Sequence, residues 1–127
     1  KVKERIRDVL SNALHNVNLT VPTIDELLDL EIFEVKSSVN LKISCDIDQS
    51  NPQHKELMEE FEVFDNISLR EYGEKDRYTI LADGATLFFA AVSRESDRYL
   101  TFTTSDSKQI KIFNALVMET WLRGRKI

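Results

Sequence analysis

The sequence contains few of the residues that interrupt regular structure or cross-link a chain. Its 127 residues include three glycines, two prolines and one cysteine. This scarcity of glycine and proline predicts that most of the chain forms helices and strands joined by short turns. The single cysteine, Cys45, excludes an intrachain disulfide and fits a reducing cytoplasm. Because Cys45 lies in an apolar run, we predict a buried, unreactive thiol.

The same scarcity argues against several kinds of site. The glycines at positions 73, 84 and 124 are too far apart to form a phosphate-binding loop. One cysteine and two histidines, His15 and His54 in separate predicted helices, do not make a zinc site. We interpret His15 as a boundary residue of its helix and His54 as a solvated surface residue. We therefore expect no cofactor and no metal.

Positive charge is also in short supply. The net charge of −5 argues against nucleic-acid binding by this chain alone, because phosphate binding needs a clustered positive surface. The longest apolar run, Leu87 to Val92, is too short to span a bilayer, and we expect no membrane partner. A content of 42% hydrophobic and 31% charged residues is typical of one folded globular domain.

The strongest local signal is Asp83-Gly84, which separates the apolar runs Tyr78 to Ala82 and Thr86 to Val92. Asp-Gly supplies the positive φ angles of a tight hairpin turn, and turn chemistry is the preferred interpretation of Asp83. Neither run alternates cleanly with polar residues, which is typical of strands that are covered on both faces. We therefore place this hairpin at the centre of a layered domain.

Helix-start signals divide the rest of the chain. Thr23 to Glu26 matches a capping box, either Ser50 or Asn51 can cap a helix that begins at Pro52, and Asp106 opens the last helix. Gly124 ends that helix, where a left-handed residue is tolerated.

The periodicity predicts helices at 2–15, 24–34, from 52 to about 64, and 106–124, and strands at 17–21, 39–47, 67–72, 78–82, 86–92 and 99–103, with a turn at 95–98. Leu57, Met58, Phe61 and Phe64 form the inner stripe of the helix that starts at Pro52. This order predicts an α/β domain with a mixed β-sheet and helices on both faces.

The first helix has an apolar stripe with two interpretations. Val2, Ile6, Val9 and Ala13 recur at three- and four-residue intervals. The spacing fits the end of a linker or coiled coil that pairs two subunits, and it fits equally well a helix that packs on its own sheet. The chain starts at Lys1 already in this pattern, so we interpret residues 1–127 as one domain of a longer protein.

The order of these elements resembles one repeat of the phospholipase D fold, and more narrowly the effector domain of TrmB-type archaeal transcriptional regulators. The resemblance rests on Asn-Val-Asn-Leu-Thr-Val-Pro, Val-Asn-Leu-Lys-Ile-Ser, Ile-Ser-Leu-Arg, Arg-Tyr-Thr-Ile-Leu-Ala-Asp-Gly and the final Phe-x-x-Leu-Val-x-x-x-Trp. It covers nearly the whole chain.

The resemblance also locates the family's catalytic signature, His-x-Lys-x-x-x-x-Asp. Laid on residues 76–83 it matches at Asp83 alone: Asp76 stands at the place of the nucleophilic histidine and Tyr78 at that of the lysine. An attack on a phosphodiester needs an imidazole nucleophile and positive charge beside the phosphoryl oxygens. We therefore predict that this chain is not an enzyme.

The resemblance implies a sensor and dimerisation domain of a transcriptional regulator. DNA would be bound by a helix-turn-helix domain upstream, and the protein would be a homodimer. Any small-molecule effector would bind near strand ends, with Pro22, Asp48, Asp76, Tyr78 and Thr104 as candidate ligand-binding residues and Val2, Ile6, Val9 and Ala13 as candidate dimer contacts. The well-known members bind sugar partly through an additional C-terminal domain; we expect residues 1–127 to lack that extension, which argues against a sugar ligand for this domain. The alternatives are a dimerisation module without a ligand and a diverged phosphodiesterase or nuclease.

Overall fold

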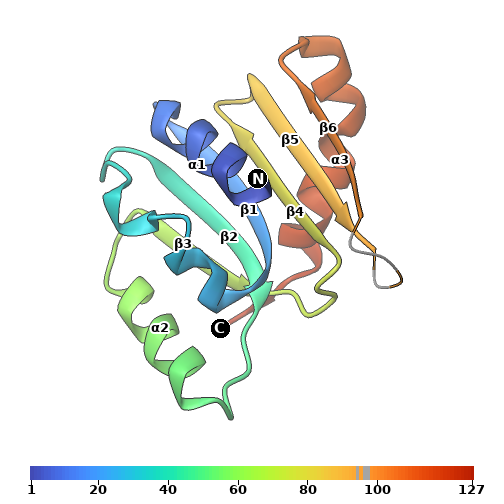
Figure 1. The fold of residues 1–127 in the computed structure, drawn as a ribbon. Helices are drawn as coiled ribbons and strands as arrows, with labels where there is room; N and C mark the ends of the chain where they lie inside the picture. The colour runs from blue at the N-terminus through green and yellow to red at the C-terminus, as the bar shows by residue number, and fades with distance from the viewer. Residues whose placement is uncertain (94, 96–97) are drawn as a thin grey trace.

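One mixed β-sheet organises the chain (Figure 1). The computed structural model describes residues 1–93, 95 and 98–127, so the predicted turn at 95–98 lies mostly outside the described residues. Within these residues the sheet has seven strands in the order β6-β5-β4-β1-β2-β3-β7. They are β1 (Asn16–Thr23), β2 (Asn40–Asp46), β3 (Ile67–Glu71), β4 (Arg77–Ala82), β5 (Thr86–Val92), β6 (Tyr99–Thr104) and β7 (Arg125–Lys126).

Strand direction divides the sheet into two halves. β1, β2 and β3 are parallel, whereas β4, β5 and β6 form an antiparallel meander that joins β1 through β4. The two-residue β7 pairs antiparallel with β3 and was not predicted from the sequence. The α/β class and the mixed sheet are confirmed.

The hairpin between β4 and β5 has the predicted turn chemistry. Asp83 and Gly84 have φ angles of 56° and 63°, and the Ala85 amide donates to the Ala82 carbonyl at 2.9 Å. Both strands are buried at most positions because helices cover both faces of the sheet. The turn and the burial of the hairpin are therefore confirmed, but its central place is not: β1 is the middle strand of the sheet, and β5 lies next to the edge strand β6.

Helices cover the two faces of the sheet unequally. The helix α1 (Val2–Asn12), the 3-10 helices η1 (Ile24–Leu28) and η2 (Ile32–Glu34), and α2 (Pro52–Glu62) lie on one face, where the large apolar core is. The helix α3 (Ser107–Arg123) lies behind the sheet in Figure 1. The apolar cluster beneath α3 is small and centres on Leu87, Ile110 and Val117.

The predicted helix at 24–34 is wrong in type. The segment forms η1 and η2, and Glu31 between them has a φ of 56°, which interrupts any continuous helix. Its buried residues Ile24, Leu27 and Leu30 follow one another at intervals of three. A 3-10 helix has three residues per turn, so this spacing places all three side chains on one buried line.

The predicted helix starts at α2 and α3 are confirmed, whereas the predicted conformation at the end of α3 is wrong. The caps Asn51 and Asp106 accept from the amides of the two residues after Pro52 and Ser107, as the capping signals indicate. At Gly124 the expected left-handed conformation is absent, since its φ is −65°. The reason for glycine is crowding: an added Cβ would lie 2.9 Å from the Thr120 carbonyl oxygen and 3.0 Å from Cβ of Arg70.

Candidate functional site

The sheet brings most of the candidate ligand-binding residues to one edge. β1 and β2 are parallel and end together, with Thr23 opposite Asp46, and β4 runs the other way, so it begins at this edge. Pro22 lies at the end of β1, Asp48 follows β2, and Asp76 and Tyr78 lie at the start of β4. Carboxyl ends of parallel strands are a frequent place for binding sites in α/β sheets.

Thr104 does not join them, which corrects the expectation that all five residues gather. In the meander Tyr78 pairs with Ala90, whereas Thr104 pairs with Leu87, near the β4–β5 turn. Thr104 is therefore at the opposite end of the sheet. Its hydroxyl donates to Gln109 Oε1 at 2.5 Å and accepts from the Asp106 amide at 3.0 Å, so it supports the start of α3.

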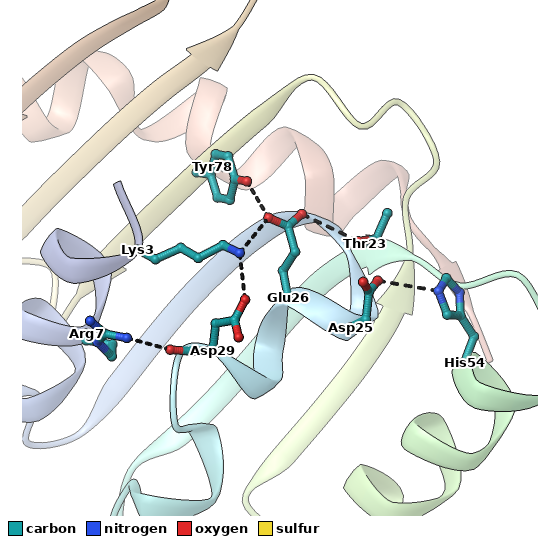
Figure 2. Close-up of polar contacts among 8 residues, drawn as sticks. All are labelled: Lys3, Arg7, Thr23, Asp25, Glu26, Asp29, His54 and Tyr78. Carbon is teal, nitrogen blue, oxygen red and sulfur yellow. Dashed lines mark hydrogen bonds and ion pairs between the residues drawn. The ribbon is translucent and has the colours of Figure 1, made fainter. Parts of the chain in front are cut away.

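The carboxylate of Glu26 is the centre of the polar cluster at this edge (Figure 2). The hydroxyl of Tyr78 donates to Glu26 Oε1, and Lys3 Nζ lies 3.4 Å from the same oxygen. The hydroxyl of Thr23 donates to Glu26 Oε2 at 3.4 Å. Lys3 also donates to Asp29 at 2.7 Å. Side chains from α1, β1, η1 and β4 thus meet at one carboxylate.

The environment of Tyr78 favours its neutral form. The residue is buried, and its ring lies in an edge-on arrangement 6.3 Å from that of Tyr99. Burial raises the pKa of the Tyr78 phenol above its ordinary value of 10.0, and the hydrogen bond to Glu26 raises it further. Tyr78 is therefore a hydrogen-bond donor in this cluster and carries no charge at neutral pH.

His54 differs from its interpretation as a solvated surface residue. Its side chain is only 12% exposed and lies between two groups near the carboxyl end of β2. Nδ1 accepts from the Asp48 amide at 3.0 Å, and Nε2 lies 3.4 Å from Asp25 Oδ1. An Nδ1 that accepts assigns the proton to Nε2, which points at the Asp25 carboxylate. Asp48 itself is exposed and accepts from Ser50.

Asp76 forms an ion pair with its neighbour Arg77, whose side chain lies on the face of the sheet that α3 covers. Arg77 donates to both carboxylate oxygens of Asp76, at 2.9 and 3.1 Å, and to Glu119 of α3 at 3.1 Å. The hydrogen bond with Asp76 raises the pKa of the Arg77 guanidinium above its ordinary value. Alternate residues of a strand face opposite sides, so Arg77 faces α3 while Tyr78 faces η1.

Asp83 has a structural role far from Tyr78. Its carboxylate accepts from the amides of Leu14, His15 and Asn16 at 2.9, 2.7 and 2.9 Å. These three donors belong to the turn between α1 and β1, which the carboxylate holds against the β4–β5 turn. These hydrogen bonds lower the pKa of the Asp83 carboxyl below its ordinary value of 3.8, and the bond from the Asn16 amide has the largest effect.

The candidate dimer contacts on α1 pack against the domain itself. Ile6 and Ala13 are 0% and 5% exposed, and Val2 and Val9 are partly buried against the same core. Of the two interpretations of this stripe, the structure shows the second: α1 packs on the sheet of its own domain. Because this face of α1 already has a partner within the domain, it is not a free surface for a second subunit.

Metal-binding groups, membrane-spanning helices and an accessible thiol are absent from the described residues. The described part of the chain has no group of three or more His, Cys, Asp or Glu side chains arranged to hold a metal ion. None of the helices within it is long and apolar enough to cross a membrane. Cys45 is fully buried as predicted, and burial raises the pKa of its thiol.

Most of the cluster around Glu26 could not be predicted from the sequence. Glu26 fits the local pattern of a helix cap, and nothing in the sequence around Lys3 indicates a partner for its ammonium group. The capping pair Thr23 and Glu26 was the one available signal, and the two side chains do contact each other. The partners Tyr78 and Lys3 come from distant parts of the chain, and no local pattern indicates them.

Comparison with known proteins places the fold. No protein-family model matches the sequence, and no curated protein matches it. Among solved structures, TrmBL2, an archaeal chromatin protein that binds DNA, superposes with a TM-score of 0.72 at 17% identity over 98% of this chain. NucT from Helicobacter pylori has a TM-score of 0.68 at 12% identity, and Nuc of Salmonella typhimurium, a phospholipase D family member, 0.63 at 13%.

These likenesses show that the chain has a phospholipase D-like fold, as predicted. The coverage differs between the neighbours: this chain spans 50% of the TrmBL2 chain, but 89% of NucT and 90% of Nuc. The same fold is thus found in a DNA-binding chromatin protein and in a phospholipase D family member. Function has to be argued from the residues of the site.

Proposed function

We propose that this chain is a non-catalytic regulatory domain of a transcriptional regulator. The observation that carries the proposal is the state of Asp76 and Tyr78, the residues at the places of the family's nucleophile and lysine. Asp76 forms an ion pair with Arg77, and Tyr78 donates to Glu26. The position of the family's catalytic signature is occupied by a neutral phenol, two carboxylates and their internal partners.

The chemistry at this edge opposes a phosphodiester. Glu26, Asp29 and Asp76 contribute three carboxylates, and the nearby cations Lys3 and Arg77 are each paired with a carboxylate. A phosphoryl group would meet repulsion where an enzyme supplies positive charge. Of the two histidines, His54 contacts Asp25 and the Asp48 amide, and His15 is next to β1's first residue at the opposite edge.

In this proposal DNA is bound by another domain of the same protein. The net charge of −5 supports this division, since a DNA-binding surface needs clustered cations. TrmBL2, of which this chain matches half, is consistent with such an arrangement. The test is to compare the 127-residue domain with the longest product of its gene in a DNA mobility-shift assay. Binding by the longer protein alone is expected; DNA binding by the isolated domain would contradict the proposal.

The small-molecule effector and the homodimer belong to the same proposal. An uncharged ligand would bind at the Tyr78 edge, where the phenol can donate to it or contact it through its ring. A metabolite series should therefore raise the melting temperature of the domain, and the rise should be lost in Tyr78→Phe. Light scattering tests the dimer. If the protein is a dimer and no metabolite shifts the transition, the ligand-free dimerisation module is the better description.

A diverged phosphodiesterase is the second candidate, because NucT and Nuc share this fold. It predicts hydrolysis of bis(4-nitrophenyl) phosphate that depends on His54 or Asp83. We expect no hydrolysis above that of a buffer blank. Turnover that His54→Ala or Asp83→Asn abolishes, in a variant that still folds, would overturn the non-catalytic assignment.

A further inference from the structure

An exposed aromatic patch lies at the end of α2, away from the Tyr78 edge and from α3. Phe33 of η2 stacks on Phe61 with ring centroids 4.7 Å apart and planes within 6° of parallel. Phe64 lies 5.4 Å from Phe33. Phe61 is 0% exposed, whereas Phe33, Phe64 and the adjacent Val63 are 43%, 40% and 78% exposed. Phe61 is thus the buried base of an apolar surface formed by the other three.

This patch differs from its sequence interpretation. Phe64 belongs to the predicted inner stripe of α2, but α2 ends at Glu62 and Phe64 lies beyond it. The amide of Phe64 donates to the Phe61 carbonyl and its own carbonyl accepts from Ile67, so the turn holds the ring at the surface. Large exposed apolar side chains that gather in this way mark interaction sites more often than isolated ones do.

The two chain segments that form the patch are mostly acidic, and Arg7 of α1 lines the same surface pocket as Glu31 and Glu34. These segments, residues 31–36 and 60–65, contain Glu31, Glu34, Glu60, Glu62 and Asp65 against the single cation Lys36. All five carboxylates are exposed, and no ion pair is formed by any of them in the described part of the chain. An apolar centre with an unpaired acidic rim is complementary to apolar anchors flanked by lysine or arginine.

We propose that Phe33, Val63 and Phe64, with these five carboxylates, form a docking surface for a basic amphipathic helix of a partner protein. The charge decides between possible occupants. A two-fold contact of the patch with a second copy would bring two acidic rims together and repel. An anionic lipid surface would be repelled for the same reason. A basic helix instead matches both the apolar centre and the rim.

The test uses the 127-residue chain labelled with ¹⁵N and a synthetic amphipathic helix of leucine and lysine. A matched peptide keeps the leucines and replaces each lysine by glutamate. We expect saturable amide shift changes at residues 31–36 and 60–66 with the lysine peptide and none with the glutamate peptide. Saturable changes centred on another surface, no saturable change, or equal binding of both peptides would each overturn the proposal.

Variants distinguish specific binding at the patch from non-specific binding to exposed apolar side chains. The double variant Phe33→Ser/Phe64→Ser should weaken the lysine peptide by roughly tenfold or more, because apolar anchors dominate such interfaces. The control Ile112→Ser/Leu122→Ser removes side chains of α3 that are 73% and 70% exposed, and it should change affinity less than about twofold. Equal losses in both variants would contradict a specific surface.

The charged rim gives a second readout that does not depend on the aromatic core. Glu60→Gln/Glu62→Gln alters two exposed side chains, leaves the fold intact, and should weaken binding and reduce its salt dependence. Unchanged salt dependence would contradict the charge argument. Sedimentation velocity of the free protein tests the second copy: self-association that Phe33→Ser/Phe64→Ser abolishes would assign the surface to a homo-oligomer and overturn the proposal.

Discussion

The hydroxyl of Tyr78 donates a hydrogen bond to the carboxylate of Glu26, a residue 52 positions earlier in the chain. Lys3 of α1 contacts the same carboxylate, so three segments of the domain are joined at one side chain. In the phospholipase D family this part of the fold has its catalytic signature. In this protein it has a closed set of internal polar contacts, which is the basis for proposing a regulatory domain.

Removal of the Tyr78 hydroxyl should destabilise the domain. Tyr78→Phe leaves the ring in place and deletes the donor to Glu26, so we expect a loss of about 1–2 kcal/mol in the free energy of unfolding by urea. Tyr99→Phe is the matched control, because Tyr99 is 46% exposed and should lose less than about 0.5 kcal/mol. Equal stabilities of Tyr78→Phe and the unmutated protein would show that the contact contributes nothing.

The carboxylate of Asp83 should matter for folding. Asp83→Ala leaves three backbone amides without their acceptor. It also places alanine at a positive φ angle, which aspartate and asparagine tolerate better. We therefore expect the free energy of unfolding to fall by about 2–4 kcal/mol. Asp83→Asn retains one acceptor oxygen and tolerates that φ, and should lose less. Urea unfolding measures both; an Asp83→Ala variant as stable as Asp83→Asn would contradict the three-amide role.

Asp83 also predicts how stability depends on pH. Its pKa in the folded protein is below the ordinary 3.8, so the stability that it contributes is present above pH 4 and is lost as the pH falls through the folded pKa. The urea midpoint of the unmutated protein should therefore fall between pH 5 and pH 2.5. Asp83→Asn should fall less steeply over the same range, and parallel curves would exclude Asp83 as a source of this dependence.

The burial of α1 predicts which of its residues stabilise the domain. Ile6→Ala creates a cavity beneath a fully buried side chain and should cost about 2–4 kcal/mol. The control Leu14→Ala changes a residue that is 62% exposed and should cost less than about 0.5 kcal/mol. If α1 instead paired two subunits, Ile6→Ala would change the molecular mass in light scattering and leave the unfolding of the domain little affected.

Two glycines allow a paired test of close packing. Gly124→Ala would place its Cβ 2.9 Å from a backbone oxygen that cannot move freely, and we expect a loss of about 1–3 kcal/mol. At Gly73 the nearest atom, Asp46 Oδ1, lies 3.4 Å from such a Cβ, which is an ordinary contact. Gly73→Ala should thus be close to neutral in thermal unfolding. A neutral Gly124→Ala would show that α3 and β3 can separate at little cost.

Much of the fold follows from the sequence because the relevant forces are local. Asp83-Gly84 determines the β4–β5 hairpin through backbone conformation, and the caps Asn51 and Asp106 determine where α2 and α3 begin. Local rules fail where packing competes with them. The capping signal at Thr23 predicts an α-helix after it. The segment instead forms the 3-10 helices η1 and η2, because its buried residues recur at intervals of three.

What the sequence by itself determined is therefore most of the helices and strands, the mixed sheet and the absence of the family's histidine and lysine at positions 76 and 78; the 3-10 form of η1 and η2 and the strand β7 were not determined by it. The tertiary structure alone decided which side chains meet. It brought Tyr78, Glu26 and Lys3 together, and it set Thr104 at the other end of the sheet. It also turned the α1 stripe onto the domain's own core. Such contacts depend on the register between strands that are distant in the sequence, and a local pattern of residues does not determine that register.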